Sequence, residues 1–153
     1  MATATAPQTS SLQIRRTFSA PREKVFRAWT DPETLKQWFG PPGFKTTAAE
    51  VDLRLGGKFR LTIEKPNGDV VSAFGTFREI RPSERLVCSW NWDYNDIGDT
   101  ILTLEFLDAG GETELVLTHE RFATIEQRDG HNTGWTGCFD KLDEFLHSQK
   151  GVR

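Results

Sequence analysis

The stretch Gln127–Ser148, QRDGHNTGWTGCFDKLDEFLHS, predicts a long helix around which the rest of the chain folds. Apolar residues recur at helical spacing and would share one face: Trp135, Cys138, Phe139, Leu142, Phe145 and Leu146. Such a face has to be covered by another element. Three glycines, Gly130, Gly134 and Gly137, interrupt its first half, and each destabilises a helix interior by about 1 kcal/mol relative to alanine. We therefore expect the first half to lie over a pocket and the second half to anchor the core.

The segments before this helix alternate between apolar and polar residues with the period of strands. One strand is expected from Leu12, and six consecutive antiparallel strands are expected from Phe44 to Glu120. Two short helices lie between the first strand and the others. The first begins with Pro21 at its first helical position, and the second begins at Asp31 with a carboxylate cap followed by proline. This order predicts an α+β fold, with a curved antiparallel sheet of about seven strands wrapped around the last helix.

Length and composition indicate one ordinary globular domain. The chain has 153 residues, of which 37% are hydrophobic and 27% charged. We expect a single domain at 12–148, a disordered leader at 1–11 and a tail at 149–153. No apolar run approaches the roughly 18 residues that a membrane span needs, and the N-terminus lacks the pattern of a signal peptide, so we expect a cytoplasmic protein.

Charge and cysteine usage exclude further classes. The formal net charge of −3 and the pI near 5.6 provide no basic field for a phosphate backbone, so nucleic acid is not an expected partner. Cys88 and Cys138 stand apart without a CxxC pattern. They are interpreted as two buried, reduced thiols, although the sequence leaves a disulfide open. The oligomeric state, monomer or homodimer, is also left open.

Three motifs carry a resemblance to a known superfamily: DLRLGGKFR at 52–60, GTFREIRPSERLVCSW at 75–90 and DGHNTGWTGCFDKLDEFL at 129–146. With the order of elements, they resemble the START-like (SRPBCC, helix-grip) superfamily, and within it the bacterial branch similar to the activator-of-heat-shock-chaperone-ATPase domain. The resemblance covers 12–146, and Leu55 departs from it where proline is expected. It implies a helix-grip fold and a cavity for a small, mostly apolar molecule. The name of the branch adds a link to chaperones and the stress response.

The face assignments lead to the same cavity between the concave sheet and the long helix. Aromatic lining with a few polar groups is typical of ligand pockets, and five tryptophans are available. Ordinary core packing remains the alternative for each side chain. The predicted ligand-binding residues are Trp38, Phe59, Leu61, Trp90, Trp92, Leu104, Leu117, His119, His131, Trp135 and Cys138.

His119 and His131 are the candidate catalytic residues, because histidine titrates near neutral pH and both are expected to face the cavity. No serine or cysteine nucleophile is visibly paired with either of them. A polar contact to a ligand and an ordinary buried histidine therefore stay open as alternatives. The spacing of histidines and carboxylates matches no metal site, so neither a metal nor another cofactor is expected.

Three functions are compatible with these observations. The favoured one is non-catalytic binding of a small hydrophobic or aromatic ligand. The second is an enzyme resembling the polyketide cyclase and aromatase relatives of the fold, in which a histidine or an acid moves protons. The third is a chaperone-interacting module, which is the weakest because the sequence shows neither an additional domain nor an obvious tail for a partner.

Overall fold

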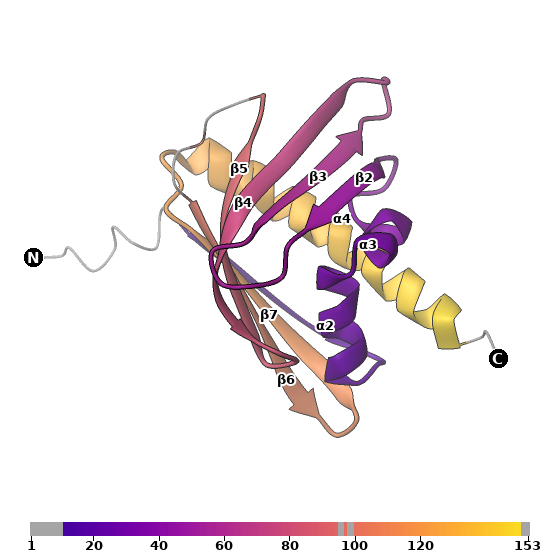
Figure 1. The fold of residues 1–153 in the computed structure, drawn as a ribbon. Coiled ribbons are helices and arrows are strands. Elements are labelled where there is room, and N and C mark those ends of the chain that lie inside the picture. Colours follow the sequence, from indigo (N-terminus) through magenta and orange to yellow (C-terminus); the bar gives the residue numbers. More distant parts are fainter. Residues whose placement is uncertain (1–10, 95–96, 98–99, 151–153) are drawn as a thin grey trace, which may run out of the picture.

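A computed structural model describes residues 11–94, 97 and 100–150, and it shows one curled antiparallel sheet wrapped around a long helix (Figure 1). The sheet has seven strands in the order β1-β7-β6-β5-β4-β3-β2. The elements are β1 (Leu12–Phe18), α2 (Arg22–Thr30), α3 (Pro32–Trp38), β2 (Lys45–Val51), β3 (Lys58–Glu64), β4 (Val70–Arg81), β5 (Arg85–Trp92), β6 (Thr100–Ala109), β7 (Glu112–Glu120) and α4 (Ile125–Lys150). The predicted fold class is confirmed.

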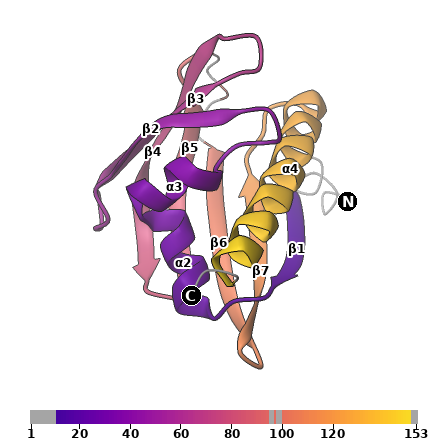
Figure 2. The ribbon, with the colours of Figure 1, turned by 90° about the vertical axis from the view of Figure 1, so that its right-hand side faces the viewer.

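The strands follow the alternation in the sequence. In β3 the side chains of Phe59, Leu61 and Ile63 are buried, while those of Lys58 and Arg60, at alternate positions, are exposed. Because neighbouring strands keep this register, the buried side chains of the sheet share its concave face. Figure 2 shows α2, α3 and α4 on that face, with β1 and β2 at the two edges of the sheet.

Two glycines bring neighbouring parts of the sheet close together. Gly75 lies inside β4, which is continuous from Val70 to Arg81. A side chain at Gly75 would place its Cβ 1.9 Å from the backbone oxygen of Ser89, so glycine permits the close approach of β5 to β4. The second glycine of the β2–β3 turn, Gly57, accepts a bond from the amide of Phe77, which joins this turn to β4.

The two short helices begin almost where the sequence predicted. Pro21 was predicted as the first helical position, but it is the N-cap of α2, which begins one residue later at Arg22. Asp31 caps α3: its Oδ2 accepts bonds from the amide of Thr34 at 3.0 Å and from the Thr34 hydroxyl at 2.7 Å. This carboxylate satisfies an amide that the first turn of a helix leaves without a partner.

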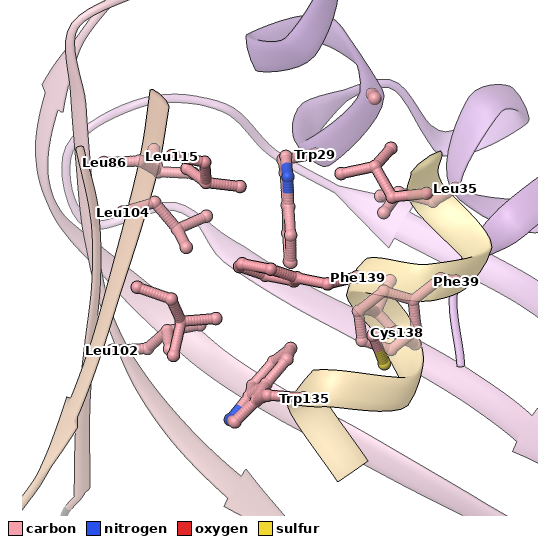
Figure 3. Close-up of a cluster of buried hydrophobic side chains, with 14 of the residues drawn as sticks. Trp29, Leu35, Phe39, Leu86, Leu102, Leu104, Leu115, Trp135, Cys138 and Phe139 are labelled. Carbon is pink, nitrogen blue, oxygen red and sulfur yellow. The ribbon is translucent and has the colours of Figure 1, made fainter. Parts of the chain in front are cut away.

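Helix α4 extends the predicted range by two residues at each end, to Ile125 and Lys150. The core lies where its second half meets the sheet and α2, and in Figure 3 the side chains of Phe139, Trp29 and Leu104 point toward one another. Leu142 is fully buried in the same half of α4. The predicted anchoring role of this half is confirmed. Residues 1–10 of the expected leader at 1–11 and residues 151–153 of the expected tail at 149–153 lie outside the described residues.

Candidate ligand-binding cavity

A cavity of about 450 Å³ lies under the N-terminal half of α4. Its walls come from α4, the adjacent ends of β3, β4 and β5, and the loops that follow α3 and β5. This volume falls within the range of small-molecule sites. The described lining residues are Phe39, Pro41, Phe44, Ile63, Lys65, Val71, Trp90, Trp92, Tyr94, Ile97, Glu126, Gln127, Gly130, His131, Gly134, Trp135 and Cys138.

Two of the three glycines of α4 create part of this space. Gly130 and Gly134 line the cavity, and a Cβ added to either would meet no other atom within 4 Å. Gly137 has a different role, because a Cβ there would lie 2.9 Å from Pro42 Cδ and 3.2 Å from Pro41 Cβ. The expectation that the glycine-interrupted half of α4 lies over a pocket therefore holds for Gly130 and Gly134, whereas Gly137 allows α4 to pack against the loop after α3.

A cluster of indole rings forms the deep wall. The ring centroids of Trp90 and Trp135 lie 5.0 Å apart, and those of Trp90 and Trp92 lie 5.7 Å apart with the rings nearly perpendicular. Trp90 and Trp135 are buried and Trp92 is half-buried. The indole nitrogen of Trp90 is buried without a hydrogen-bond partner among the described residues. The deep wall is thus an aromatic surface whose one unpartnered donor is buried.

Hydrogen bonds fix the ring of His131 at the edge of this wall. Its Nδ1 lies 2.7 Å from the backbone oxygen of Gln127, and its Nε2 accepts the indole N–H of Trp92 at 2.9 Å. Because a carbonyl oxygen can only accept, Nδ1 carries the proton and Nε2 provides the lone pair. His131 is therefore neutral, and both of its ring nitrogens are occupied.

His119 lies in β7 behind the cavity and is fully buried. Its Nδ1 accepts the indole N–H of Trp135 at 3.1 Å, and its Nε2 lies 2.9 Å from the hydroxyl oxygen of Thr100. The Thr100 hydroxyl donates to the backbone oxygen of Trp90, so the proton between His119 and Thr100 belongs to Nε2 of the histidine. His119 is thus neutral in the opposite tautomer, with both nitrogens occupied.

The surroundings of the two histidines keep them neutral. Burial lowers the pKa of His119 well below its usual value, and the neighbouring His131 lowers it further. Burial also lowers the pKa of His131, an effect that the bond to Gln127 partly offsets. The two rings are in contact, with centroids 5.1 Å apart. A general base needs a free lone pair within reach of the substrate, and neither ring offers one in this arrangement.

The structure brings five of the eleven predicted ligand-binding residues together in the wall of the cavity: Trp90, Trp92, His131, Trp135 and Cys138. The other six lie outside it. Trp38 is buried under α2 and donates its indole N–H to the backbone oxygen of Ala28. Phe59, Leu61 and Leu104 line a separate space of about 30 Å³ between the sheet and the short helices. Leu117 and His119 are fully buried core residues.

Several lining residues were not predicted, and most of them lie in loops. Tyr94 and Ile97 belong to the segment between β5 and β6, which is described only in part. Phe39 and Phe44 flank the loop after α3. Loops have no periodicity that assigns side chains to a face. The one indication in the sequence that the segment between β5 and β6 contributes a lining residue is Ile97, an isolated apolar residue between polar ones, which is 3% exposed.

Both cysteines are free, buried thiols, as predicted. Burial raises the pKa of Cys88 to about 12 and that of Cys138 to about 12. A thiol of this kind is not a nucleophile near neutral pH. Within the described residues, no cluster of three or more histidine, cysteine or acidic side chains could hold a metal ion. Likewise, no helix in that part of the chain is long and apolar enough to cross a membrane.

The curled seven-stranded sheet, the two short helices between β1 and β2, and the long C-terminal helix over a cavity define a helix-grip α+β domain of the START-like superfamily. Within this class, a family model described as "Activator of Hsp90 ATPase homolog 1-like protein" matches residues 19–147. The chain belongs to that family.

Solved structures of bacterial proteins share the fold over most of both chains. A protein from Chromobacterium violaceum is 25% identical, with a TM-score of 0.82 over 90% of this chain and 96% of that one. A protein from Rhodobacter sphaeroides is 29% identical, with a TM-score of 0.79 over 92% of this chain and 94% of its own.

The curated relatives are longer proteins. The human protein named "Activator of 90 kDa heat shock protein ATPase homolog 1" is 27% identical over 128 residues, which are 83% of this chain and 34% of the human protein. The mouse protein of the same name is 28% identical over the same shares. This chain thus spans about a third of the length of the curated relatives it matches.

Proposed function

We propose that the protein binds a small hydrophobic or aromatic molecule in the cavity under α4, without transforming it. The observation that carries the proposal is the cavity of about 450 Å³ itself. Indole rings and aliphatic side chains form its wall, and glycines replace side chains where α4 passes over it. A void of this size bounded by apolar groups gains free energy when an apolar molecule fills it.

The hydrogen bonds around the histidines favour binding over catalysis. A cyclase-like enzyme would need a proton donor or acceptor that faces the reacting atoms. His131 is the histidine in the cavity wall, and its two ring nitrogens are already bonded to Trp92 and Gln127. Its role in the proposal is to hold the Trp92 ring in place. Cys138 adds no nucleophile, because burial raises the pKa of its thiol to about 12.

The test uses N-phenyl-1-naphthylamine, a neutral aromatic dye whose fluorescence rises in apolar surroundings. We expect saturable binding to the wild-type protein and at least tenfold weaker binding to Gly134→Leu. The leucine side chain extends into open space at the cavity wall, and leucine favours a helix more than glycine does. The variant should therefore remain folded while part of the cavity is filled.

Asn132→Leu is the matched control, because it adds the same side chain to an exposed position of α4 that does not line the cavity. Its dye affinity should equal that of the wild type. The proposal fails if the wild-type protein binds no dye, or if Gly134→Leu and Asn132→Leu bind it equally well.

A second candidate function is contact with a chaperone, which the names of the curated relatives support. The matched region covers only 34% of the human protein, so the activity in that name concerns a much longer chain. An ATPase assay with a 90 kDa heat shock protein, with and without this protein, distinguishes the two functions. We expect an unchanged rate, and a stoichiometric complex with faster hydrolysis would favour the chaperone role.

A further inference from the structure

The cavity has one lysine at its rim. Lys65 directly follows β3 and is half-buried, and its Nζ lies 5.2 Å from the centroid of the Tyr94 ring. Among the described lining residues it carries the sole positive charge, and it forms no ion pair with any residue of the described chain. A partly desolvated cation with an aromatic neighbour and no carboxylate partner can still pair with an anion.

The backbone holds Lys65 at this place. Its amide donates to the backbone oxygen of Asp69 at 2.8 Å, and its own backbone oxygen accepts from Gly68 at 2.9 Å, so the residue is fixed in the β3–β4 turn. Tyr94 follows β5, the neighbour of β4 on the other side from β3. The lysine side chain thus reaches past the start of β4 toward the loop after β5, and the Tyr94 ring positions its ammonium group beside the cavity.

The polar side chains of the deep wall have few unused acceptors. The lone pair on His131 Nε2 is taken by Trp92, and the indole N–H of Trp135 is taken by His119. The indole N–H of Trp90 has no partner among the described residues, but it is fully buried and so is not open to a ligand. The sole carboxylate in the described lining, that of Glu126, is exposed in the first turn of α4. The described wall therefore offers few acceptors to a ligand with donor groups or a positive charge.

We infer that the ligand is an aromatic or otherwise apolar molecule with an anionic head group, such as a carboxylate or sulfonate, and that Lys65 determines this preference. The inference rests on the proposed binding function. The apolar body lies against Trp90, Trp92 and Trp135, while the head group lies at the rim beside Lys65. The ion pair is partly exposed, so it contributes selectivity rather than most of the affinity.

Two dyes with the same ring system separate the charge from the apolar body. 8-Anilinonaphthalene-1-sulfonate carries a sulfonate that N-phenyl-1-naphthylamine lacks. In Lys65→Met we expect affinity for the anionic dye to fall about threefold to tenfold, while affinity for the neutral dye stays within about twofold. Tyr94→Leu should show a smaller loss for the anionic dye, because the ammonium group loses the ring that positions it.

Lys58→Met is the matched control, since it removes the same charge from the other end of β3 at an exposed position that does not line the cavity. It should leave both affinities within twofold of the wild type. The inference is overturned if Lys65→Met and Lys58→Met change the affinity for the anionic dye equally, or if Lys65→Met weakens both dyes alike. A wild-type protein that binds neither dye would instead contradict the binding function itself, so the two failures are distinguishable.

Discussion

Trp92 donates its indole N–H to Nε2 of His131 at 2.9 Å, and this bond ties the end of β5 to the first half of α4. Gly134, one turn further along the helix, leaves the space beside it open. The N-terminal half of α4 therefore meets the sheet through a hydrogen-bonded pair beside a cavity. Its C-terminal half packs against the sheet in the core. This contrast defines which substitutions should affect stability and which should affect binding.

Replacing His131 with leucine should destabilise the protein. The change leaves the half-buried indole N–H of Trp92 without its acceptor, and it also removes the bond to the backbone oxygen of Gln127. Urea denaturation should show a loss of about 1–2 kcal/mol in the free energy of unfolding. His147→Leu, at an exposed position of the same helix, should stay within about 0.5 kcal/mol of the wild type. Equal stability of the two variants would show that the Trp92–His131 bond contributes nothing.

Stability should fall as the pH drops below about 6.5. Both His119 and His131 have pKa values lowered from the ordinary 6.5 in the folded protein, chiefly by burial. Above that pH the histidines are neutral in the folded and unfolded chains, and their contribution to stability is complete. Below it the unfolded chain binds protons first, so the free energy of unfolding falls until the folded pKa is passed. Each histidine contributes a slope of up to about 1.4 kcal/mol per pH unit.

Urea denaturation at pH 7.5, 6.5 and 5.5 measures this slope. The pKa of Asp31 is also shifted: the hydrogen bond from the Thr34 hydroxyl is the main cause that lowers it from the ordinary value of 3.8. Its contribution is therefore lost at a more acidic pH than that of the histidines. His131→Gln should reduce the slope, because one of the two groups no longer titrates. A wild-type protein equally stable at pH 7.5 and 5.5 would contradict the assignment of two neutral histidines.

The fold could be predicted because each element carries its own local signal. The strands alternate with period two, Asp31 caps α3, and the apolar stripe of α4 requires a partner. The same alternation explains why only five of the eleven predicted ligand-binding residues line the cavity. It shows that Trp90, Leu104 and Leu117 face the concave side, but it does not show how far along the sheet each one lies. Phe139 fills the space beside Leu104, whereas no side chain projects from α4 at Gly134.

The hydrogen bonds of the histidines could not be predicted from the sequence. His131 and Trp92 are 39 positions apart, and His119 and Trp135 are 16 apart. Both pairs depend on how α4 is placed over the sheet, which local propensities do not determine. For the same reason a histidine facing a cavity was compatible with catalysis, with ligand contact and with a structural role until its partners were known.

Neither cysteine should react with iodoacetamide in the folded protein at pH 8. Burial raises the pKa of both thiols to about 12, which leaves almost no thiolate at that pH. Mass spectrometry should show no alkylation of Cys88 or Cys138 under native conditions and complete alkylation of both in urea. Rapid native labelling of Cys138, which lines the cavity, would show that the cavity opens to water and reagents more readily than the structure indicates.

Alanine at two glycines of α4 should have opposite effects on stability. Gly134→Ala places a methyl group in open space and should raise the free energy of unfolding by about 0.5–1 kcal/mol, because alanine favours a helix. Gly137→Ala places its Cβ 2.9 Å from Pro42 Cδ and 3.2 Å from Pro41 Cβ. The proline rings are stiff, so the helix or the loop has to shift, and overpacking of this kind costs about 1–3 kcal/mol. That cost exceeds the gain in helix propensity.

Urea denaturation of the two alanine variants, with Gly130→Ala as a second substitution into open space, measures this difference. We expect Gly130→Ala and Gly134→Ala to unfold at higher urea concentration than the wild type and Gly137→Ala to unfold at lower concentration. If all three variants were stabilised alike, the loop at 41–42 would have to yield freely to the helix. Gly137 would then not be required for the packing of α4 against that loop.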